Sequence, residues 1–250
     1  MRETILSKLY EIESKENVKI LLAVESGSRA WGFASPDSDY DVRFVYVRPR
    51  EEYLRLARPR DVIELPIEGE LDINGWDLDK TLRLLRASNP TLFEWFASPI
   101  VYRETAFAGE LRGVMQRYFS ARRALRHYLS MAGNNYRAYL RADTVKPKKY
   151  FYALRPVLAC RWVLDKGTPP PMLFSELMEA ELDPALLPEV NRLLELKRNA
   201  PEVKTIPAIE SIGRYLVSSM EELRGKIVLM PEDMRHEWEE LDRLFLSQLE

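Results

Sequence analysis

The sequence predicts an α+β protein, with a mixed sheet and flanking helices in its first part and only helices in the remainder. Two observations support this prediction. Apolar runs typical of strands occur before residue 104 and almost vanish after it, and apolar residues at helical spacing dominate beyond it. A chain of 250 residues with 46% hydrophobic content can bury a substantial core. We therefore expect two domains, at residues 1–104 and 105–250.

The elements of the first domain follow from local patterns. Apolar residues three and four apart predict helices, apolar runs predict strands, and proline, glycine or polar clusters mark their ends. In chain order these patterns predict a helix over 3–14, a strand over 18–25, a short helix from 28, a turn at 36–38, a strand over 41–47, a short helix over 50–57, strands over 62–67 and 70–73 around a hairpin turn at 68–69, helices over 76–88 and 91–97, and a short strand over 100–102.

The second domain shows helical spacing almost throughout. The pattern predicts helices over 107–129, 149–164, 172–182, 186–198 and 206–223, and a last helix over 231–249 that starts with proline followed by acidic residues. Residues 134–137 are expected to form a loop. The segment Gly167–Pro171 is typical of a rigid linker.

Charge and composition exclude several classes of protein. The formal net charge is −2, so any polyanion has to be held by a local basic patch rather than by the whole molecule. The single cysteine, Cys160, excludes an internal disulfide and suits a reducing cytoplasm. The two histidines, His127 and His236, cannot build a four-ligand zinc site with that cysteine unless carboxylates contribute.

The ends and the apolar runs of the chain indicate where the protein resides. An amphipathic pattern follows Met1, where a signal peptide would show an apolar run, and no apolar stretch approaches the length of a membrane span. We therefore expect a cytoplasmic protein without a membrane partner.

The segment from Leu21 to Val42 is the most informative part of the chain. On a strand, Asp39 and Asp41 would project to the same side, with about 7 Å between their Cα atoms. Two carboxylates on one face repel each other unless a cation lies between them, and Mg²⁺ prefers such oxygen ligands. Gly27 and Ser28 offer backbone N–H groups to a phosphate, and Gly27 has no Cβ to block its approach. A phosphate holder with a metal holder indicates phosphoryl or nucleotidyl transfer.

This arrangement resembles the signature of the DNA polymerase β-like nucleotidyltransferases, in which an apolar-Gly-(Gly/Ser) motif precedes Asp-x-(Asp/Glu). The longer run Gly-Ser-Arg-Ala-Trp-Gly-Phe, followed by Ser-Asp-Tyr-Asp-Val-Arg, is similar to a bacterial and phage subfamily named for an RNA repair pathway. Further likeness at 75–94 and 146–162 extends the resemblance over about residues 18–175. It implies a polymerase β-like core, a nucleoside triphosphate such as ATP as substrate, and two Mg²⁺ or Mn²⁺ ions.

The resemblance also implies roles for three carboxylates. Asp39 and Asp41 would bind the metal that accompanies the nucleotide, and a third carboxylate from a later strand would complete the second metal site. Asp72, between Leu71 and Ile73, matches that context. Asp77 matches locally as well, but it lies where the next helix begins and an acidic cap is expected. We therefore assign the third catalytic and metal-binding role to Asp72 and keep Asp77 as the alternative.

The phosphates of the nucleotide have two sets of candidate ligands. Gly27 and Ser28 would hold the β- and γ-phosphates, and Arg29 would neutralise them, unless it forms a surface salt bridge. Trp31 and Phe33 either line the site or pin the loop to the core, and we leave them unassigned. The second set lies in a basic and aromatic cluster at 141–162, from which we select the nucleotide-binding candidates Lys148, Lys149, Tyr152 and Arg155. This cluster could equally bind a nucleic-acid backbone or form a solvated basic face.

The acceptor is not determined by these motifs. The same chemistry serves RNA or DNA ends, protein side chains and small molecules. The resemblance favours a nucleic-acid end, in repair or modification. A nucleotide-sensing module without catalysis is a further alternative, although a third carboxylate argues against it.

Overall fold

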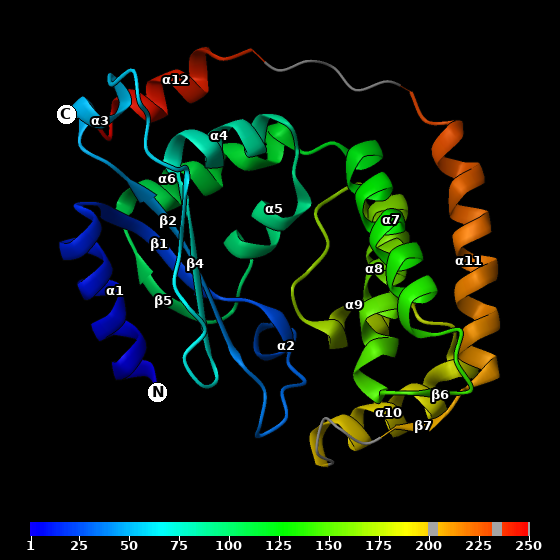
Figure 1. Ribbon diagram of the computed structural model, residues 1–250. Helices are drawn as coiled ribbons and strands as arrows, with labels where there is room; N and C mark the ends of the chain where they lie inside the picture. The colour runs from blue at the N-terminus through cyan, green and yellow to red at the C-terminus, as the bar shows by residue number, and fades with distance from the viewer. Residues whose placement is uncertain (200–204, 232–236, 250) are drawn as a thin grey trace. The chain divides into compact units, whose positions relative to one another are not determined.

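The computed structural model describes residues 1–199, 205–231 and 237–249, and these pack into two compact units (Figure 1). Unit 1 comprises Met1–Ala30, Asp39–Tyr118 and Met234–Glu250, and unit 2 comprises Trp31–Ser38 and Phe119–Asp233. The predicted α+β class is confirmed by a five-stranded sheet with flanking helices and a separate set of helices. The domains predicted at 1–104 and 105–250 stay a prediction, because compact packing does not establish which segments fold independently.

Unit 1 is built on a five-stranded mixed sheet in the order β3-β4-β2-β1-β5. Its strands are β1 (Lys19–Glu25), β2 (Tyr40–Val47), β3 (Val62–Glu64), β4 (Leu71–Asp77) and β5 (Val101–Glu104). The neighbours β2 and β4 are parallel, whereas the other neighbours in this sheet are antiparallel. The parallel pair therefore starts at one end of the sheet, where Asp41 lies opposite Asp72.

Helices cover both faces of this sheet (Figure 1). On one face, Ile5, Leu9 and Ile12 of α1 (Arg2–Glu16) join a core with the inward side chains of β2 and β4. On the other lie α4 (Leu78–Arg86), α5 (Pro90–Phe96) and α6 (Ala106–Met115), and the Trp76 ring of β4 lies 3.9 Å from the Trp95 ring of α5. The short helices α2 (Gly27–Ala30) and α3 (Arg50–Tyr53) follow β1 and β2, and η1 (Gln116–Tyr118) follows α6.

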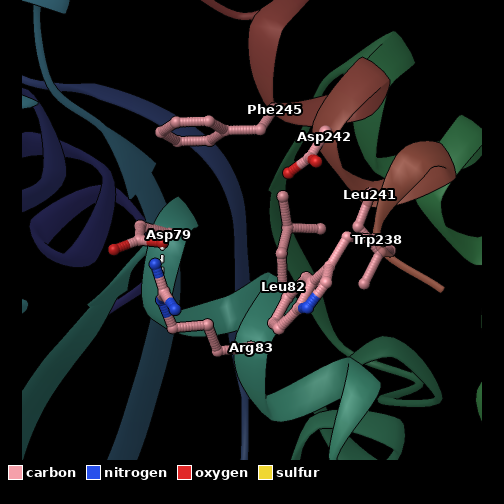
Figure 2. Close-up of a pocket in the computed structure, with 7 residues that line it drawn as sticks. All are labelled: Asp79, Leu82, Arg83, Trp238, Leu241, Asp242 and Phe245. Atoms are coloured by element: carbon pink, nitrogen blue, oxygen red, sulfur yellow. Dashed lines mark hydrogen bonds and ion pairs between the residues drawn. The ribbon is translucent and has the colours of Figure 1, made fainter. Parts of the chain in front are cut away.

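The C-terminal helix α12 (Glu239–Leu246) packs against α4 in unit 1. Between them lies a small pocket of about 180 Å³, drawn in Figure 2 with its lining residues Asp79, Leu82, Arg83, Trp238, Leu241, Asp242 and Phe245. Aromatic contacts hold this helix: the Arg86 guanidinium lies 4.1 Å from the Trp238 ring, and the Phe245 ring meets the Tyr53 ring edge-on at 5.0 Å. The described end of the chain thus returns to the unit in which the chain begins.

In its described residues, unit 2 is helical apart from one pair of very short strands. Its elements are α7 (Ala121–Tyr139), β6 (Thr144–Val145), α8 (Pro147–Lys166), α9 (Phe174–Glu181), η2 (Pro184–Leu186), α10 (Leu187–Asn199), β7 (Ile206–Pro207) and α11 (Glu210–Val228). The long helices α7 and α8 pack together, and α11 packs on both. Helix α8 begins with Pro147 and ends at Gly167, whose φ of +66° suits a glycine cap.

The loop from Trp31 to Ser38 is packed into the core of unit 2. The Phe33 side chain is 2% exposed, and its ring centre lies 4.7 Å from that of Phe151. The buried ammonium of Lys197 donates hydrogen bonds to Ser35 Oγ at 2.6 Å and Ser38 Oγ at 3.2 Å. Trp31 and Phe33, left unassigned from the sequence, therefore anchor this loop to the helices.

Several predicted boundaries need correction. The single helix predicted over 107–129 is divided into α6, η1 and α7, because Ser120 caps a new helix by accepting a hydrogen bond from the Arg123 N–H. The loop predicted at 134–137 was wrong, since these residues continue α7, with Asn135 bonded to the Met131 carbonyl. β4 continues through Asp77, where a helix was predicted from 76.

The remaining differences concern short elements and the end of the chain. The strands β6 and β7 were not predicted, because two-residue strands carry too little pattern to be recognised. Of the helix predicted over 231–249, residues 232–236, with His236, lie outside the described residues, and α12 begins at Glu239. In the part of the chain that the structure describes, no helix is both long and apolar enough to cross a membrane.

Candidate functional site

The turn after β1 places Gly27 directly against Asp41. Gly27 has a φ of +58°, a conformation that residues with a Cβ rarely adopt. A Cβ added at this position would lie 2.0 Å from Oδ2 of Asp41. The backbone is tied to the same residue, since the Ser26 N–H donates to the Asp41 carbonyl at 2.8 Å. The predicted phosphate holder and the predicted carboxylate are therefore adjacent, and the glycine is required for this approach.

Asp41 and Asp72 project from one face of the sheet and share one guanidinium group. The two residues are partners in the parallel pair of β2 and β4, so their side chains point the same way. Nη2 of Arg43 donates to Oδ1 of Asp41 at 3.0 Å and to Oδ2 of Asp72 at 2.7 Å. Nη1 of Arg43 donates to the carbonyls of Val42 and Asp72, both at 3.1 Å. Arg43 thus offsets part of the negative charge of the pair and ties the two strands together.

The electrostatics of Asp41 show that this face favours a positive charge. Burial raises the pKa of Asp41, and the nearby carboxylates of Asp72 and Asp39 raise it further, whereas Arg43 lowers it. A cation between these carboxylates relieves both the desolvation and the repulsion. Sequence reasoning missed Arg43, although residues 41 and 43 lie on the same side of a strand by simple alternation.

Asp39 and the residues of the first motif lie at the same end of the sheet. Asp39 is exposed and directly precedes β2, so strand alternation does not decide whether its side chain points to the same side as that of Asp41. Nε of Arg29 donates to the Asp39 carbonyl at 3.1 Å, and the guanidinium lies 3.6 Å from the centre of the Tyr40 ring. Ser28 is half-buried in the short helix α2. The structure thus gathers Gly27, Ser28, Arg29, Asp39, Asp41 and Asp72 within unit 1.

Asp77 has the structural role that was expected of an acid at its position. Its Oδ1 accepts hydrogen bonds from the Asp79 N–H at 2.9 Å and from the Tyr53 hydroxyl at 3.0 Å, so it caps α4. Burial raises the pKa of Asp77 to about 6. Because Asp72 and Asp77 are five positions apart on one strand, they face opposite sides of the sheet. The geometry therefore places Asp72, and not Asp77, beside Asp41.

Glu25 is a buried acid that the sequence analysis did not single out. Its side chain is fully buried, with Oε1 accepting from the Asp41 N–H at 2.7 Å and Oε2 accepting from the Tyr102 hydroxyl. Burial raises the pKa of Glu25 above its ordinary value. The sequence feature that could have identified Glu25 is its position as an acidic residue at the end of the apolar run that forms β1. Glu25 braces the backbone from which Asp41 projects.

The donor set fits an oxygen-preferring cation, although the described side chains do not form a closed metal cluster. Within residues 1–199, 205–231 and 237–249, no group of three or more His, Cys, Asp or Glu side chains is arranged to hold a metal ion. Asp41 and Asp72 instead converge on the guanidinium of Arg43. Carboxylate oxygens are the ligands that Mg²⁺ and Mn²⁺ prefer, so the donor atoms of this pair suit such an ion, although a guanidinium bridges them here.

The second set of candidates lies on α8 in unit 2. Nζ of Lys149 lies 3.6 Å from the centre of the Tyr139 ring and 5.0 Å from that of Tyr152. The Tyr152 ring meets the Trp31 ring edge-on at 6.0 Å. Lys148 is half-buried in the first turn of the helix. Lys149 and Tyr152 therefore belong to an aromatic and cationic cluster around Trp31.

Arg155 lies deeper than a solvent-facing ligand would. It is 2% exposed, its guanidinium lies 4.8 Å from the centre of the Trp31 ring, and Nη2 is 3.7 Å from the sulfur of Met172. In this structure Arg155 holds the loop of Trp31 against α8. Nucleotide binding by Lys148, Lys149, Tyr152 and Arg155 stays a prediction.

Comparison with known proteins identifies related sequences along nearly the whole chain. The family model described as "RNA repair pathway DNA polymerase beta family" matches residues 1–247. The "Uncharacterized protein YcgL" of Bacillus subtilis (strain 168) is 45% identical over 252 residues, covering 100% of this chain and 97% of that protein. The crystal structure of a nucleotidyltransferase-like protein from Exiguobacterium sibiricum 255-15 is 17% identical, covers 98% of this chain and 89% of that chain, and has a TM-score of 0.33.

Proposed function

The chain belongs to the RNA repair pathway DNA polymerase beta family, and on this premise we propose that it is a metal-dependent nucleotidyltransferase. The reaction is the transfer of a nucleoside monophosphate from a nucleoside triphosphate, such as ATP, to a hydroxyl group. The observation that supports this proposal best is the pairing of Asp41 with Asp72 across β2 and β4, next to the Gly27 turn. Carboxylates and a close backbone approach on one sheet face suit the triphosphate and its cations.

The proposed metal ligands are Asp39, Asp41 and Asp72. Two Mg²⁺ or Mn²⁺ ions held by these residues would stabilise charge on the phosphates and lower the pKa of the acceptor hydroxyl. The protein contributes the preorganisation of these ligands. Glu25 fixes the N–H of Asp41, and Arg43 holds the carboxylates of Asp41 and Asp72, so two of the three proposed ligands are already positioned side by side.

The proposed phosphate ligands are Gly27, Ser28 and Arg29. The left-handed turn at Gly27 accommodates the Asp41 carboxylate, and Ser28, directly after it, offers an N–H and a hydroxyl group to a phosphate. Arg29 is positioned by the Asp39 carbonyl and the Tyr40 ring, so its charge is held at the carboxylate end of the site. A positioned guanidinium loses less conformational entropy on binding a phosphate than a free one.

We propose a nucleic-acid end as the acceptor, in agreement with the description of the family. The local concentration of arginines in unit 2, in a chain of net charge −2, supports a polyanionic partner. A protein side chain and a small molecule are the alternative acceptors. A nucleotide sensor without catalysis is the alternative to enzyme function.

The test compares wild type with Asp41→Asn and a matched control, Asp61→Asn. Asp61 lies in the same unit and forms an exposed pair with Lys80. The proteins are incubated with Mg²⁺ or Mn²⁺, labelled nucleoside triphosphates and a panel of oligonucleotides, proteins and small hydroxyl compounds. We expect label transfer to an oligonucleotide end, a loss of about 10³-fold in Asp41→Asn, and no loss in Asp61→Asn.

The possible outcomes of this assay separate the alternatives. Transfer to a protein or a small hydroxyl compound, with the same dependence on Asp41, would retain the chemistry and replace the acceptor. Nucleotide binding without turnover would support the sensor. Equal transfer by wild type and Asp41→Asn would exclude the proposed catalytic site.

A further inference from the structure

A groove on unit 2 lies between α7 and α11, outside the site described above. It has a volume of about 520 Å³, with Arg126, Leu129 and Arg137 from α7 and Arg224, Ile227 and Val228 from α11 among its lining residues. The two helices run alongside each other in Figure 1. The volume is that of a typical small-molecule or nucleotide site.

The groove is strongly basic. It is lined by three arginines and by no acidic residue. Among the residues that the structure describes, neither Arg126 nor Arg224 has an ion pair or a side-chain hydrogen bond. The sequence shows the same bias, because seven arginines and no aspartate or glutamate occur between Leu111 and Ala142. An uncompensated positive surface of this kind attracts anions.

The arginines are distributed along the groove. Arg126 and Arg137 lie on one stripe of α7 and are eleven residues apart, or about 16 Å along the helix axis. A Cβ added at Gly133 would lie 3.3 Å from Nη1 of Arg137, so the guanidinium lies close over this glycine at the groove. An elongated chain of phosphates can contact charges spaced in this way, whereas a single phosphate cannot contact them all.

The floor of the groove is apolar. Leu129 and Ile227 are 9% and 6% exposed, while Val228 is 76% exposed. An open apolar surface between guanidinium groups suits a ligand that presents both flat faces and phosphates. An unstacked base with its phosphate has this chemistry, whereas in a duplex the base faces are covered by stacking.

We infer that the α7–α11 groove binds single-stranded nucleic acid. This inference deepens the proposed function, on which it rests for the choice of acceptor, by placing the acceptor strand on unit 2. It assigns phosphate contacts to Arg126, Arg137 and Arg224, and a base contact to the apolar floor around Val228.

The test measures binding of fluorescein-labelled 15-nucleotide RNA, the corresponding single-stranded DNA and a duplex by anisotropy, at several salt concentrations. The variant is Arg126→Gln with Arg224→Gln. The matched control is Arg192→Gln with Arg214→Gln, which removes the same charge from exposed positions on α10 and α11. Inorganic polyphosphate and polyglutamate serve as competitors.

We expect both single strands to bind wild type, with about tenfold weaker binding to the groove variant and unchanged binding to the control. Each neutralised phosphate contributes about 0.7 to the log–log salt dependence of single-strand binding, so the slope should decrease by about 1 to 1.5 in the groove variant. The binding assay contains neither a nucleoside triphosphate nor a divalent cation, so its result is independent of whether the proposed catalytic function holds. Preference for RNA or for DNA identifies which strand is used.

Three outcomes would overturn the inference. The first is no oligonucleotide binding to wild type at low salt, and the second is an equal loss in the groove variant and its control. The third is competition by polyphosphate or polyglutamate as effective as that of unlabelled RNA, which would indicate a site for any polyanion or for an acidic protein.

Discussion

The arginine at the carboxylate site of unit 1 and the arginines of the α7–α11 groove in unit 2 have opposite surroundings, although the chain as a whole is nearly neutral. In unit 1, Arg43 is 19% exposed and is bonded to the carboxylates of Asp41 and Asp72. In unit 2, Arg126 and Arg224 line an open groove that has no acidic lining residue. The charge of Arg43 compensates carboxylates within the protein, whereas the charges of Arg126 and Arg224 are available to a ligand. A net charge of −2 does not reveal this division.

The two sites also differ in which structural feature positions their charged groups. Strand register sets the cluster in unit 1, because a shift of one residue between β2 and β4 would turn one carboxylate to the opposite face. Helical spacing sets the groove in unit 2, where a small shift of one helix leaves its arginines on the same surface. We therefore expect the cluster in unit 1 to be the more sensitive of the two to single changes. Four predictions test this comparison.

The largest effect is expected for Asp72→Asn. This change removes the carboxylate opposite Asp41, and transfer should fall by about 10³-fold because a ligand of the proposed second metal is lost. Nucleotide affinity in the presence of Mg²⁺ should change little, since Asp39 and Asp41 remain. Single-turnover transfer and equilibrium nucleotide binding, measured on the same preparation, check this. An active Asp72→Asn with an inactive but folded Asp77→Asn would transfer the third role to Asp77.

Gly27→Ala should have the next largest effect. The added Cβ would collide with Oδ2 of Asp41 and would also strain a φ of +58°. We expect transfer to fall by about 100-fold and the free energy of unfolding to fall by roughly 2–4 kcal/mol. The control is Gly69→Ala, with a φ of +62° and no neighbouring atom within 4 Å of the added Cβ. If urea unfolding and transfer assays give both variants the same losses, backbone strain alone explains the effect.

The third prediction concerns the pH dependence of stability in unit 1. The pKa of Asp77 is about 6 in the folded protein, against an ordinary value of 3.8, so folding favours the protonated form. This contribution is fully present below pH 4 and is lost as the pH rises through 6. It amounts to roughly 3 kcal/mol at most. Asp77→Asn keeps an acceptor for the Asp79 N–H and the Tyr53 hydroxyl, but its side chain does not ionise. The free energy of unfolding of this variant, relative to that of wild type, should therefore increase as the pH rises from 4 to 7.

Urea unfolding of wild type and Asp77→Asn at pH 4.5 and 7.5 measures this difference. Asp61→Asn, which removes an exposed carboxylate of the same unit, is the control. A constant difference between wild type and Asp77→Asn at the two pH values would contradict the raised pKa.

The smallest effect is expected in unit 2, for Lys197→Met. Lys197 is 5% exposed and donates to the hydroxyls of Ser35 and Ser38. Its loss leaves these buried hydroxyls without that donor, at a cost of about 1–2 kcal/mol. Replacing both serines by alanine as well should recover part of this loss. Chemical unfolding is the measurement, and Lys226→Met, which removes an exposed pair with Glu222, should cost less than about 0.5 kcal/mol.

The sequence was informative wherever a property depends on near neighbours along the chain. Alternation placed Asp41 on a strand, the residue type predicted that Asp77 caps a helix, and the motif order indicated the family. Periodicity located α1, α8 and most strands to within a few residues. It failed within 107–139, because a break capped by Ser120 and a helix containing two asparagines both depend on side-chain hydrogen bonds rather than on apolar spacing.

By itself, the sequence determined the α+β class, the motif of Gly27 to Asp41 and the choice of Asp72 as a candidate. Only the tertiary structure decided what lies beside them: Asp72 opposite Asp41, Arg43 between the two, Glu25 under the Asp41 amide, and the loop of Phe33 in the core of unit 2. It also decided that arginines from α7 and α11 line one groove. The reason is physical. Local patterns fix which face of an element is apolar, whereas register and the pairing of distant elements follow from burying all of those faces at once.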